Sequence, residues 1–159
     1  MLRIGHGYDL HRLKGGHTLI LGGVEIKYAL GCVGHSDADV LIHSIIDALL
    51  GALALSDIGN WFPDTDEKHK DADSMQLLKS VIESECFTDW LLINLDSTII
   101  CEAPKLAKHI LSMRENIASC LASSVSRISV KAKTNERVGP LGNSEAIAVH
   151  TVLILEKKV

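Results

Sequence analysis

The sequence predicts an α/β (α+β) sandwich, a single domain in which one mixed β-sheet carries helices on one face. Three observations lead to this fold class. The chain has 159 residues, a length that suits one domain with its own core. Hydrophobic residues make up 47% of it and aromatic residues only 4%, so the core must be largely aliphatic. Extended and helical patterns alternate imperfectly along the chain, as they do where helices cover one sheet.

The N-terminal part reads as extended segments separated by glycines. Residues 2–13 predict a strand that opens into a turn at Gly15-Gly16. Residues 18–27 continue as short extended pieces, which Gly22-Gly23 interrupts, and Gly31 to Gly34 is expected to be a loop.

The middle of the chain predicts two helices around a polar loop. A long apolar helix is expected from about Asp37 to Leu55, with Ser36 or Asp37 as its N-cap. Residues 56–73 form the loop, and a second helix runs from about Ser74 to Glu85.

The C-terminal part predicts three more strands. Residues 90–101 are rich in Leu and Ile and read as a strand. Pro104 suits the first turn of a third helix that ends near Ala122. Residues 128–133 and 146–156 are the last strands, and the stretch between them, 135–144, is a loop with two glycines and a proline.

Composition narrows the class of protein. The net charge of −4 and the isoelectric point near 6.0 argue against a nucleic-acid-binding protein. No run of 18 apolar residues predicts a membrane span, and the first residues lack the layout of a targeting peptide, so we expect no membrane partner and a cytoplasmic protein. The four cysteines form no CxxC pair and are expected to be reduced thiols.

Two histidines and an aspartate suggest a metal centre. Asp9 and His11 are two residues apart on the first predicted strand, so their side chains point to the same face. His43 lies on the first predicted helix, where Asp39 and Asp47 flank it at i−4 and i+4. Two imidazoles and a carboxylate can bind zinc with one coordination position left open, an arrangement typical of enzymes.

Glycines near these residues strengthen the metal interpretation. Gly5 and Gly7 weaken a strand unless something approaches its backbone closely. Gly34-His35-Ser36 precedes a predicted helix and offers backbone N–H groups to an anion. Against this, a D-x-H pair on a strand and an acidic stripe on a helix are both common as solvated surface features, and both alternatives remain open on these residues alone.

Several segments together resemble one family, the 2-C-methyl-D-erythritol 2,4-cyclodiphosphate synthases of the non-mevalonate isoprenoid pathway. The segments occur in the family's order over almost the whole chain. They are Arg3-Ile4-Gly5-His6-Gly7-Tyr8-Asp9-Leu10-His11, His35-Ser36-Asp37-Ala38-Asp39-Val40, Asp47-Ala48-Leu49-Leu50-Gly51-Ala52, Asp57-Ile58-Gly59, Phe62-Pro63-Asp64-Thr65-Asp66, Ala72-Asp73-Ser74, Ala103-Pro104-Lys105 and Lys131-Ala132-Lys133-Thr134-Asn135-Glu136.

The resemblance implies an intramolecular phosphoryl transfer catalysed by a single domain, residues 1–159. The family's substrate is 4-diphosphocytidyl-2-C-methyl-D-erythritol 2-phosphate. Its 2-phosphate attacks the β-phosphorus of the diphosphate, CMP leaves, and a cyclic diphosphate forms. The enzyme is therefore a phosphorus–oxygen lyase that depends on divalent metal. Because the nucleophile is already an anion, positioning and charge stabilisation supply most of the catalysis.

The resemblance also assigns metal and catalytic roles. Asp9, His11 and His43 match the ligands of Zn²⁺. Glu136 matches a position that helps to hold a second ion, Mg²⁺ or Mn²⁺, although on its own it reads as an exposed loop glutamate. His35 and Thr134 match positions that stabilise the transition state.

The remaining matches are binding positions. Residues matching substrate contacts are Ser36, Asp47, Asp57, Gly59, Phe62, Pro63, Asp64, Asp66 and Lys133. Residues matching the cytosine pocket are Cys101, Ala103, Pro104, Lys105, Leu106 and Ala107. On residue type alone, Phe62-Pro63-Asp64 is also a plain surface turn, and Asp39 and Asp47 are candidates to fix the imidazole of His43.

The family forms homotrimers with active sites between subunits, and a mean hydropathy of +0.19 is compatible with apolar surface buried between copies. The chain departs from the family at several positions. Lys133 replaces a frequent Thr, while Pro140 and Asn143 replace a Phe and an Arg that line a central cavity for an isoprenoid diphosphate. Without that arginine, we expect this secondary ligand to be lost.

Two other functions compete with the cyclising enzyme. An open zinc site more often activates water, which makes a zinc hydrolase the first alternative. The absence of an HExxH motif counts against this alternative. The second alternative is a metal-stabilised trimeric binding module, in which His35, Ser36 and Thr134 would have no catalytic role.

Overall fold

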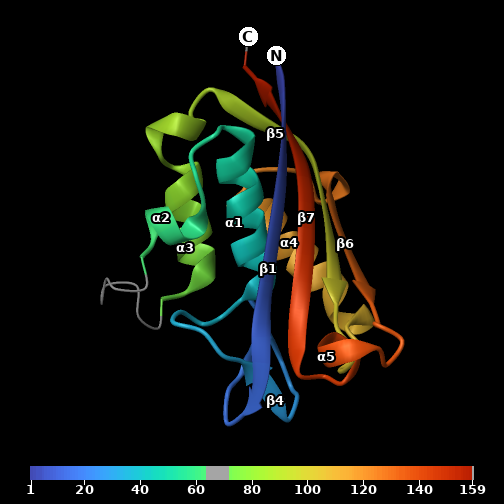
Figure 1. The fold of residues 1–159 in the computed structure, drawn as a ribbon. Helices are drawn as coiled ribbons and strands as arrows, with labels where there is room; N and C mark the ends of the chain where they lie inside the picture. Colours follow the sequence, from blue (N-terminus) through green and yellow to red (C-terminus); the bar gives the residue numbers. More distant parts are fainter. Residues whose placement is uncertain (64–71, 159) are drawn as a thin grey trace.

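The computed structural model describes residues 1–63 and 72–158. A mixed five-stranded sheet has the order β4-β1-β7-β5-β6. Its strands are β1 (Leu2–Gly15), β4 (Leu30–Cys32), β5 (Trp90–Ile100), β6 (Ile128–Lys133) and β7 (Ala146–Lys157). β5 and β6 are parallel and the other neighbours antiparallel. The chain is thus an α+β domain with one curled sheet, and both termini lie at the same end (Figure 1).

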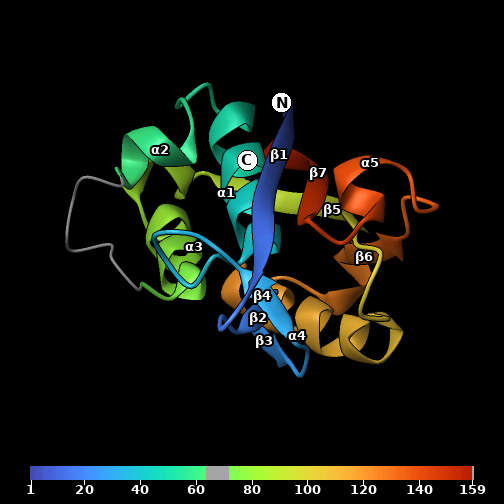
Figure 2. The same cartoon turned by 60° about the horizontal axis from the view of Figure 1, so that its bottom comes forward.

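The helices lie mainly against one face of the sheet (Figures 1 and 2). They are α1 (Val40–Ala52), α2 (Ile58–Trp61), α3 (Ser74–Ile82), α4 (Ile110–Cys120) and α5 (Gly139–Gly142). Short 3₁₀ turns occur at Glu85–Phe87, Ala107–His109 and Val125–Arg127. Among the described residues, no helix is long and apolar enough to cross a membrane.

Two glycines let α1 lie directly on β1. A Cβ at Gly5 would come within 1.8 Å of the Ala48 carbonyl oxygen, and one at Gly7 within 1.9 Å of the Ser44 oxygen. No side chain fits at either position. The expectation that something approaches this backbone closely is confirmed, and what approaches is the helix that carries His43.

A chain of hydroxyl groups crosses the aliphatic core. Thr151 Oγ1 of β7 lies 2.7 Å from Ser44 Oγ of α1 and 2.8 Å from Ser97 Oγ of β5. Ser44 also donates to the Leu41 carbonyl at 2.8 Å. All three side chains are fully buried, so the chain satisfies groups that would otherwise destabilise the core.

The N-cap of α1 differs from the prediction. Asp39, not Ser36 or Asp37, accepts from the amides of Leu41 and Ile42, at 3.2 and 3.1 Å. Its second oxygen accepts from Gly23 N at 2.8 Å. Gly22 and Gly23 have positive φ and form the turn of the hairpin made by β2 (Leu19–Leu21) and β3 (Val24–Ile26), as the glycine pair predicted.

Three other expectations were wrong in detail. Leu30–Cys32 pairs with the end of β1, so the predicted loop over 31–34 begins later. α2 lies inside the predicted polar loop, because Asp57 caps a helix too short to show a periodicity. Pro104 follows a cis peptide bond in a turn, and α4 begins only at Ile110.

Candidate active site

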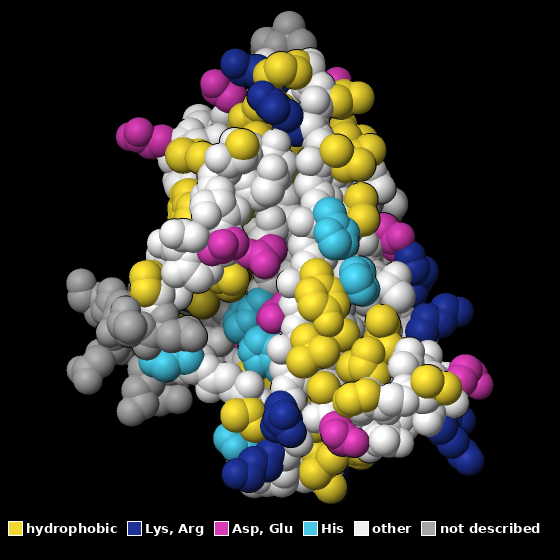
Figure 3. All heavy atoms as spheres, viewed as in Figure 1, with side chains coloured by type: hydrophobic (Ala, Val, Ile, Leu, Met, Phe, Trp, Pro, Cys, Tyr) yellow, Lys and Arg dark blue, Asp and Glu magenta, His cyan; other side chains and the backbone are white. Residues whose placement is uncertain are grey.

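Strand β1 and helix α1 bring the three predicted zinc ligands together. Asp9 Oδ2 lies 3.1 Å from Nδ1 of His11 and 3.1 Å from Nδ1 of His43. One ligand atom from each residue lies within 4.8 Å of the other two. Figure 3 shows histidine side chains in a hollow of the surface beside β1. The strand supplies two ligands from one face and the helix, held against that face, supplies the third.

The donor set fits a zinc ion. His11 Nδ1 is buried and has no hydrogen-bond partner among the described residues, although it lies beside Asp9. A buried ring nitrogen without a partner is costly unless it ligates something. Gly34 leaves room for this ring, since a Cβ there would lie 2.9 Å from His11 Nε2. Two imidazole nitrogens and one carboxylate oxygen converging on one point are a ligand set of zinc enzymes.

The charges of the three ligands are mutually supporting. Burial by itself raises the pKa of Asp9, but the adjacent imidazoles of His11 and His43 outweigh it and hold this pKa below its usual value. Burial lowers the pKa of His43, and here Asp9 outweighs it, so the pKa of His43 is raised. The carboxylate therefore stays ionised and available as a ligand.

Serine hydroxyls hold the far side of the His43 ring. Its Nε2 lies 2.9 Å from Ser74 Oγ and 3.1 Å from Ser36 Oγ. Ser74 in turn donates through both its amide and its hydroxyl to Asp37. Ser74 can thus keep a proton on Nε2, and loss of the Nδ1 proton that faces Asp9 at 3.1 Å would leave the tautomer that a metal ligand needs.

The two carboxylates predicted to fix His43 do something else. Asp39 caps α1 and is fully buried against backbone amides. Asp47 accepts from the amide of Ile58 at 2.8 Å and so holds the start of α2. The interpretation of Asp39 as a support of the imidazole was therefore wrong, and that of Asp47 as a substrate contact stays a prediction. The sequence reasoning missed the contact of Ser74 with Asp37, which joins the start of α3 to the loop before α1.

A cavity of about 240 Å³ opens beside the ligands. Its described lining residues are Asp9, His11, Gly34, His35, Ser36, His43, Ile58, Gly59, Phe62 and Leu77. Asp57 stands next to it as the N-cap of α2, and Pro63 is exposed. Asp64 and Asp66 lie outside the described residues.

The amides of the first turn of α1 form no anion site, and the anion site expected on Gly34-His35-Ser36 stays a prediction. The Asp39 carboxylate already occupies the amides of Leu41 and Ile42. His35 and Ser36 do line the cavity, so this side of it presents polar side chains instead.

A second cavity, of about 330 Å³, lies at the other edge of the sheet. Its lining includes Cys101, Pro104, Lys105, Leu106, Ala107, Lys133 and Thr134, all predicted as site residues, and also Glu102, Ile110 and Ala132. The Ala103 carbonyl accepts from the Cys101 thiol at 3.0 Å. Burial raises the pKa of that thiol to about 11.

Glu102, which sequence reasoning missed, fixes the loop after β6. Its Oε2 accepts from the amides of Asn135 at 3.0 Å and Arg137 at 3.4 Å. Between them, Glu136 has a φ of +50° and Arg137 a φ of +61°, a backbone region that non-glycine residues rarely adopt. Thr134 Oγ1 donates to Glu136 Oε1 at 2.9 Å. One carboxylate thus anchors the segment that carries Thr134 and Glu136.

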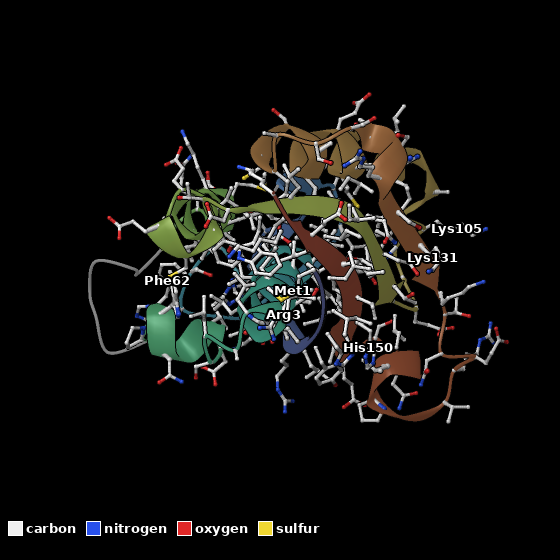
Figure 4. The ribbon with its side chains drawn as sticks, turned by 90° about the horizontal axis from the view of Figure 1, so that it is seen from above. Met1, Arg3, Phe62, Lys105, Lys131 and His150 are labelled. Atoms are coloured by element: carbon white, nitrogen blue, oxygen red, sulfur yellow. The ribbon has the colours of Figure 1, made fainter. Side chains whose placement is uncertain are left out.

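The two cavities share no lining residue and face different sides of the molecule. β7 and β5 separate β1 from β6, a span of about 14 Å at the usual strand spacing. Phe62 of the first cavity and Lys105 of the second lie on opposite sides in Figure 4. Within one chain, the predicted zinc ligands and Glu136 are therefore not brought together.

Comparison with known proteins now identifies the family. The model of the YgbB family matches residues 2–156. The chain belongs to the YgbB family. A protein of Geobacter sulfurreducens named 2-C-methyl-D-erythritol 2,4-cyclodiphosphate synthase is 54% identical over 157 residues, which cover 99% of this chain and 100% of that protein. One of the same name from Synechocystis is 52% identical over 157 residues, covering 99% and 98%.

Solved structures with more than 30% identity share the fold. A Plasmodium falciparum IspF in complex with CDP has a TM-score of 0.86 and 35% identity, with 99% of this chain and 97% of that chain covered. The bifunctional IspDF of Campylobacter jejuni has a TM-score of 0.93 and 41% identity over 99% of this chain, which spans 42% of the bifunctional chain.

Proposed function

We propose that this chain converts 4-diphosphocytidyl-2-C-methyl-D-erythritol 2-phosphate to 2-C-methyl-D-erythritol 2,4-cyclodiphosphate and CMP, in non-mevalonate isoprenoid biosynthesis. The observation that carries the proposal is the convergence of Asp9, His11 and His43 at a cavity lined by His35 and Ser36. Full-length relatives above 50% identity carry the name of this synthase. The whole chain acts as one catalytic domain.

The metal sites follow from the donors. Asp9, His11 and His43 would hold Zn²⁺, and Glu136 would share Mg²⁺ or Mn²⁺ with the substrate's phosphates. When bound, such ions supply Lewis acidity and a template for charged phosphate oxygens.

The residues around the metal site would position the reacting phosphates. In the reaction, an oxygen of the 2-phosphate bonds to the β-phosphorus, the bond from that phosphorus to the bridging oxygen breaks, and CMP leaves with that oxygen. His35 and Thr134 donate to the phosphate oxygens as their charge redistributes. Ser36 and Lys133 contact the phosphates. Holding both ends of one molecule in reach can contribute about 7–11 kcal/mol to catalysis.

The other predicted contacts divide between the sugar and the base. Asp57 and Gly59, at the start of α2, would meet hydroxyls of the ribose, and Asp47 a substrate hydroxyl. Phe62 and Pro63, with Asp64 and Asp66, would contact the methylerythritol end. The second cavity would take the cytosine, with Cys101, Ala103, Pro104, Lys105, Leu106 and Ala107 around it.

A homotrimer would complete the site. The two cavities lie on different sides of one chain, yet a single substrate must reach both, so the second cavity has to come from another copy. The uncovered face of the sheet also exposes apolar side chains. On β1 these include Ile4, 70% exposed, and Tyr8, 47% exposed, and on β7 Val152, 41% exposed. An apolar sheet face of this kind favours burial between subunits.

One assay tests the reaction. The protein is incubated with the substrate, Zn²⁺ and Mg²⁺, and ³¹P NMR follows the products. Release of CMP with a cyclic diphosphate is the expected result. A linear hydrolysis product would indicate a zinc hydrolase instead, and lack of turnover would favour a binding module.

His43→Ala tests the metal assignment. The variant should lose zinc and turnover while keeping its fold, because His43 supplies one of three ligands. Mass spectrometry measures the loss of zinc, and circular dichroism checks that the fold is kept. Full activity of this variant would contradict the assignment.

A further inference from the structure

A second pair of histidines lies on the face of the sheet that the helices leave uncovered. His6 of β1 and His150 of β7 are both exposed, and His6 Nε2 lies 3.3 Å from His150 Nδ1. Their rings stack with centroids 5.6 Å apart, and Tyr8 packs against His150 with centroids 4.7 Å apart. In Figure 3, histidine side chains appear beside hydrophobic ones on this face.

This pair is separate from the Asp9 centre. Side chains alternate along β1, so His6 and Tyr8 point outward while Gly5, Gly7 and Asp9 face α1. The sheet itself therefore lies between the two groups of ligands. No ion can bind to both at once.

The spacing of the two nitrogens matches a chelating site. Zinc binds imidazole nitrogen at about 2.0–2.1 Å, so two nitrogens at neighbouring corners of a tetrahedron lie about 3.3–3.4 Å apart. The observed 3.3 Å brings both rings into that relation without any backbone movement. The positions next to the pair carry Ile4, Tyr8, Val152 and Thr98, none of them cationic, and Lys131, opposite Thr98, is paired with Asp96.

From this geometry we propose that His6 and His150 form a second metal site, which takes Zn²⁺ or another borderline cation such as Ni²⁺ or Cu²⁺. His6 binds through Nε2 and His150 through Nδ1. Two positions of the ion remain for water or for imidazoles of other copies. In the trimer proposed above, this face is the one that packs against other copies, and metal here would link subunits.

A hydrogen bond between two neutral rings has the same nitrogen separation. The two states exclude each other, because the shared proton occupies the lone pairs that a metal requires. Metal binding must therefore displace the proton shared by the two rings and change the nitrogen chemical shifts of both.

Zinc binding by matched variants tests the proposal. Wild type, His6→Gln, His150→Gln and the control His17→Gln, an exposed histidine elsewhere, are dialysed against the same micromolar Zn²⁺, and bound zinc per chain is measured by mass spectrometry. His6→Gln and His150→Gln should bind less zinc than wild type by the same amount, and His17→Gln should match wild type. His43→Ala should lose a different, additive portion, since it belongs to the other centre.

The result that overturns the proposal is equal zinc binding by wild type, His6→Gln and His150→Gln. A second measurement uses protein labelled with ¹⁵N histidine. Zinc added after the Asp9 centre is filled should shift His6 Nε2 and His150 Nδ1, and unshifted signals would equally reject the site. Both variants lie on an exposed face, and their unfolding transitions without metal confirm that the fold is kept.

Discussion

The first cavity takes its ligands from regular elements, whereas the second depends on a loop. Asp9 and His11 project from one strand and His43 from a helix that lies on that strand backbone to backbone. Thr134 and Glu136 instead follow the end of β6, in a backbone held by hydrogen bonds to Glu102. The first arrangement is rigid because of packing, and the second because of a single carboxylate. Substitutions should therefore act on stability at the first cavity and on local order at the second.

The largest effect is expected at the β1–α1 contact. Gly7→Ala places a Cβ 1.9 Å from the Ser44 oxygen, so the helix must move away from the strand. We expect a loss of about 3 kcal/mol or more in the free energy of unfolding, measured by chemical denaturation. Gly15→Ala is the control, since a Cβ at Gly15 meets nothing within 4 Å. Equal stability of Gly7→Ala and wild type would show that the contact tolerates displacement.

A smaller effect is expected at the hydroxyl that orients His43, one of the proposed zinc ligands. Ser74→Ala removes the hydroxyl 2.9 Å from His43 Nε2 and its link to Asp37. Loss of such a supporting partner lowers metal affinity by about 10–100-fold, which competition with a zinc chelator measures. Ser80→Ala, in the same helix, removes a hydroxyl that bonds only the Leu77 carbonyl among the described contacts and should leave zinc affinity unchanged. An unchanged affinity in Ser74→Ala would mean that the strand and helix alone orient the ring.

At the second cavity, Glu102→Ala should disturb function more than stability. The amides of Asn135 and Arg137 lose their acceptor, and Glu136 loses its fixed position. We expect the Mg²⁺ concentration for half-maximal turnover to rise several-fold, with a partial effect in Glu102→Gln. Glu115→Ala, an exposed glutamate on α4, serves as control. A wild-type Mg²⁺ response in Glu102→Ala would separate this loop from the metal.

The smallest effect concerns thiol reactivity around the second cavity. Burial raises the pKa of Cys101 to about 11, so at pH 8 only about one thousandth of it is thiolate, and alkylation should accelerate about tenfold per pH unit towards that value. Cys86 is exposed. Mass spectrometry after iodoacetamide treatment should find Cys86 labelled well before Cys101. Equal labelling rates at pH 8 would show that the second cavity opens readily.

Local sequence patterns predicted the ligand residues of the first cavity better than the residues that hold those ligands in place. Spacing placed Asp9 and His11 on one face of β1 and put His43 on α1, because both elements are long and regular, but the family resemblance was needed to join the three into one site. The contacts of Ser74 with Asp37 and His43 could not be predicted, since they join segments 37 and 31 residues apart. Asp39 was misassigned because an aspartate before a helix can serve as cap or ligand support, and only the position of the Gly22-Gly23 turn decides between them.

At the second cavity, the resemblance found the residues but not their arrangement. Patterns in the sequence placed β5 and β6 correctly, yet nothing in them indicated that Glu102 reaches the loop after β6. The left-handed backbone of Glu136 and Arg137 was equally unexpected, because neither residue type favours it. Tertiary hydrogen bonds decided this conformation, and they leave no local signal.

The hydrogen-bonded hydroxyl groups of Ser44, Thr151 and Ser97 fix the relative positions of the elements they join, which the aliphatic side chains of the core do not. Leucine and isoleucine tolerate sliding, because dispersion contacts are similar after a small shift, whereas hydroxyl groups lose their partners within an ångström. These hydrogen bonds therefore fix the position of α1 along the sheet. Because Ser44 is next to His43 in sequence, the same hydrogen bonds also fix the position of the His43 imidazole relative to Asp9.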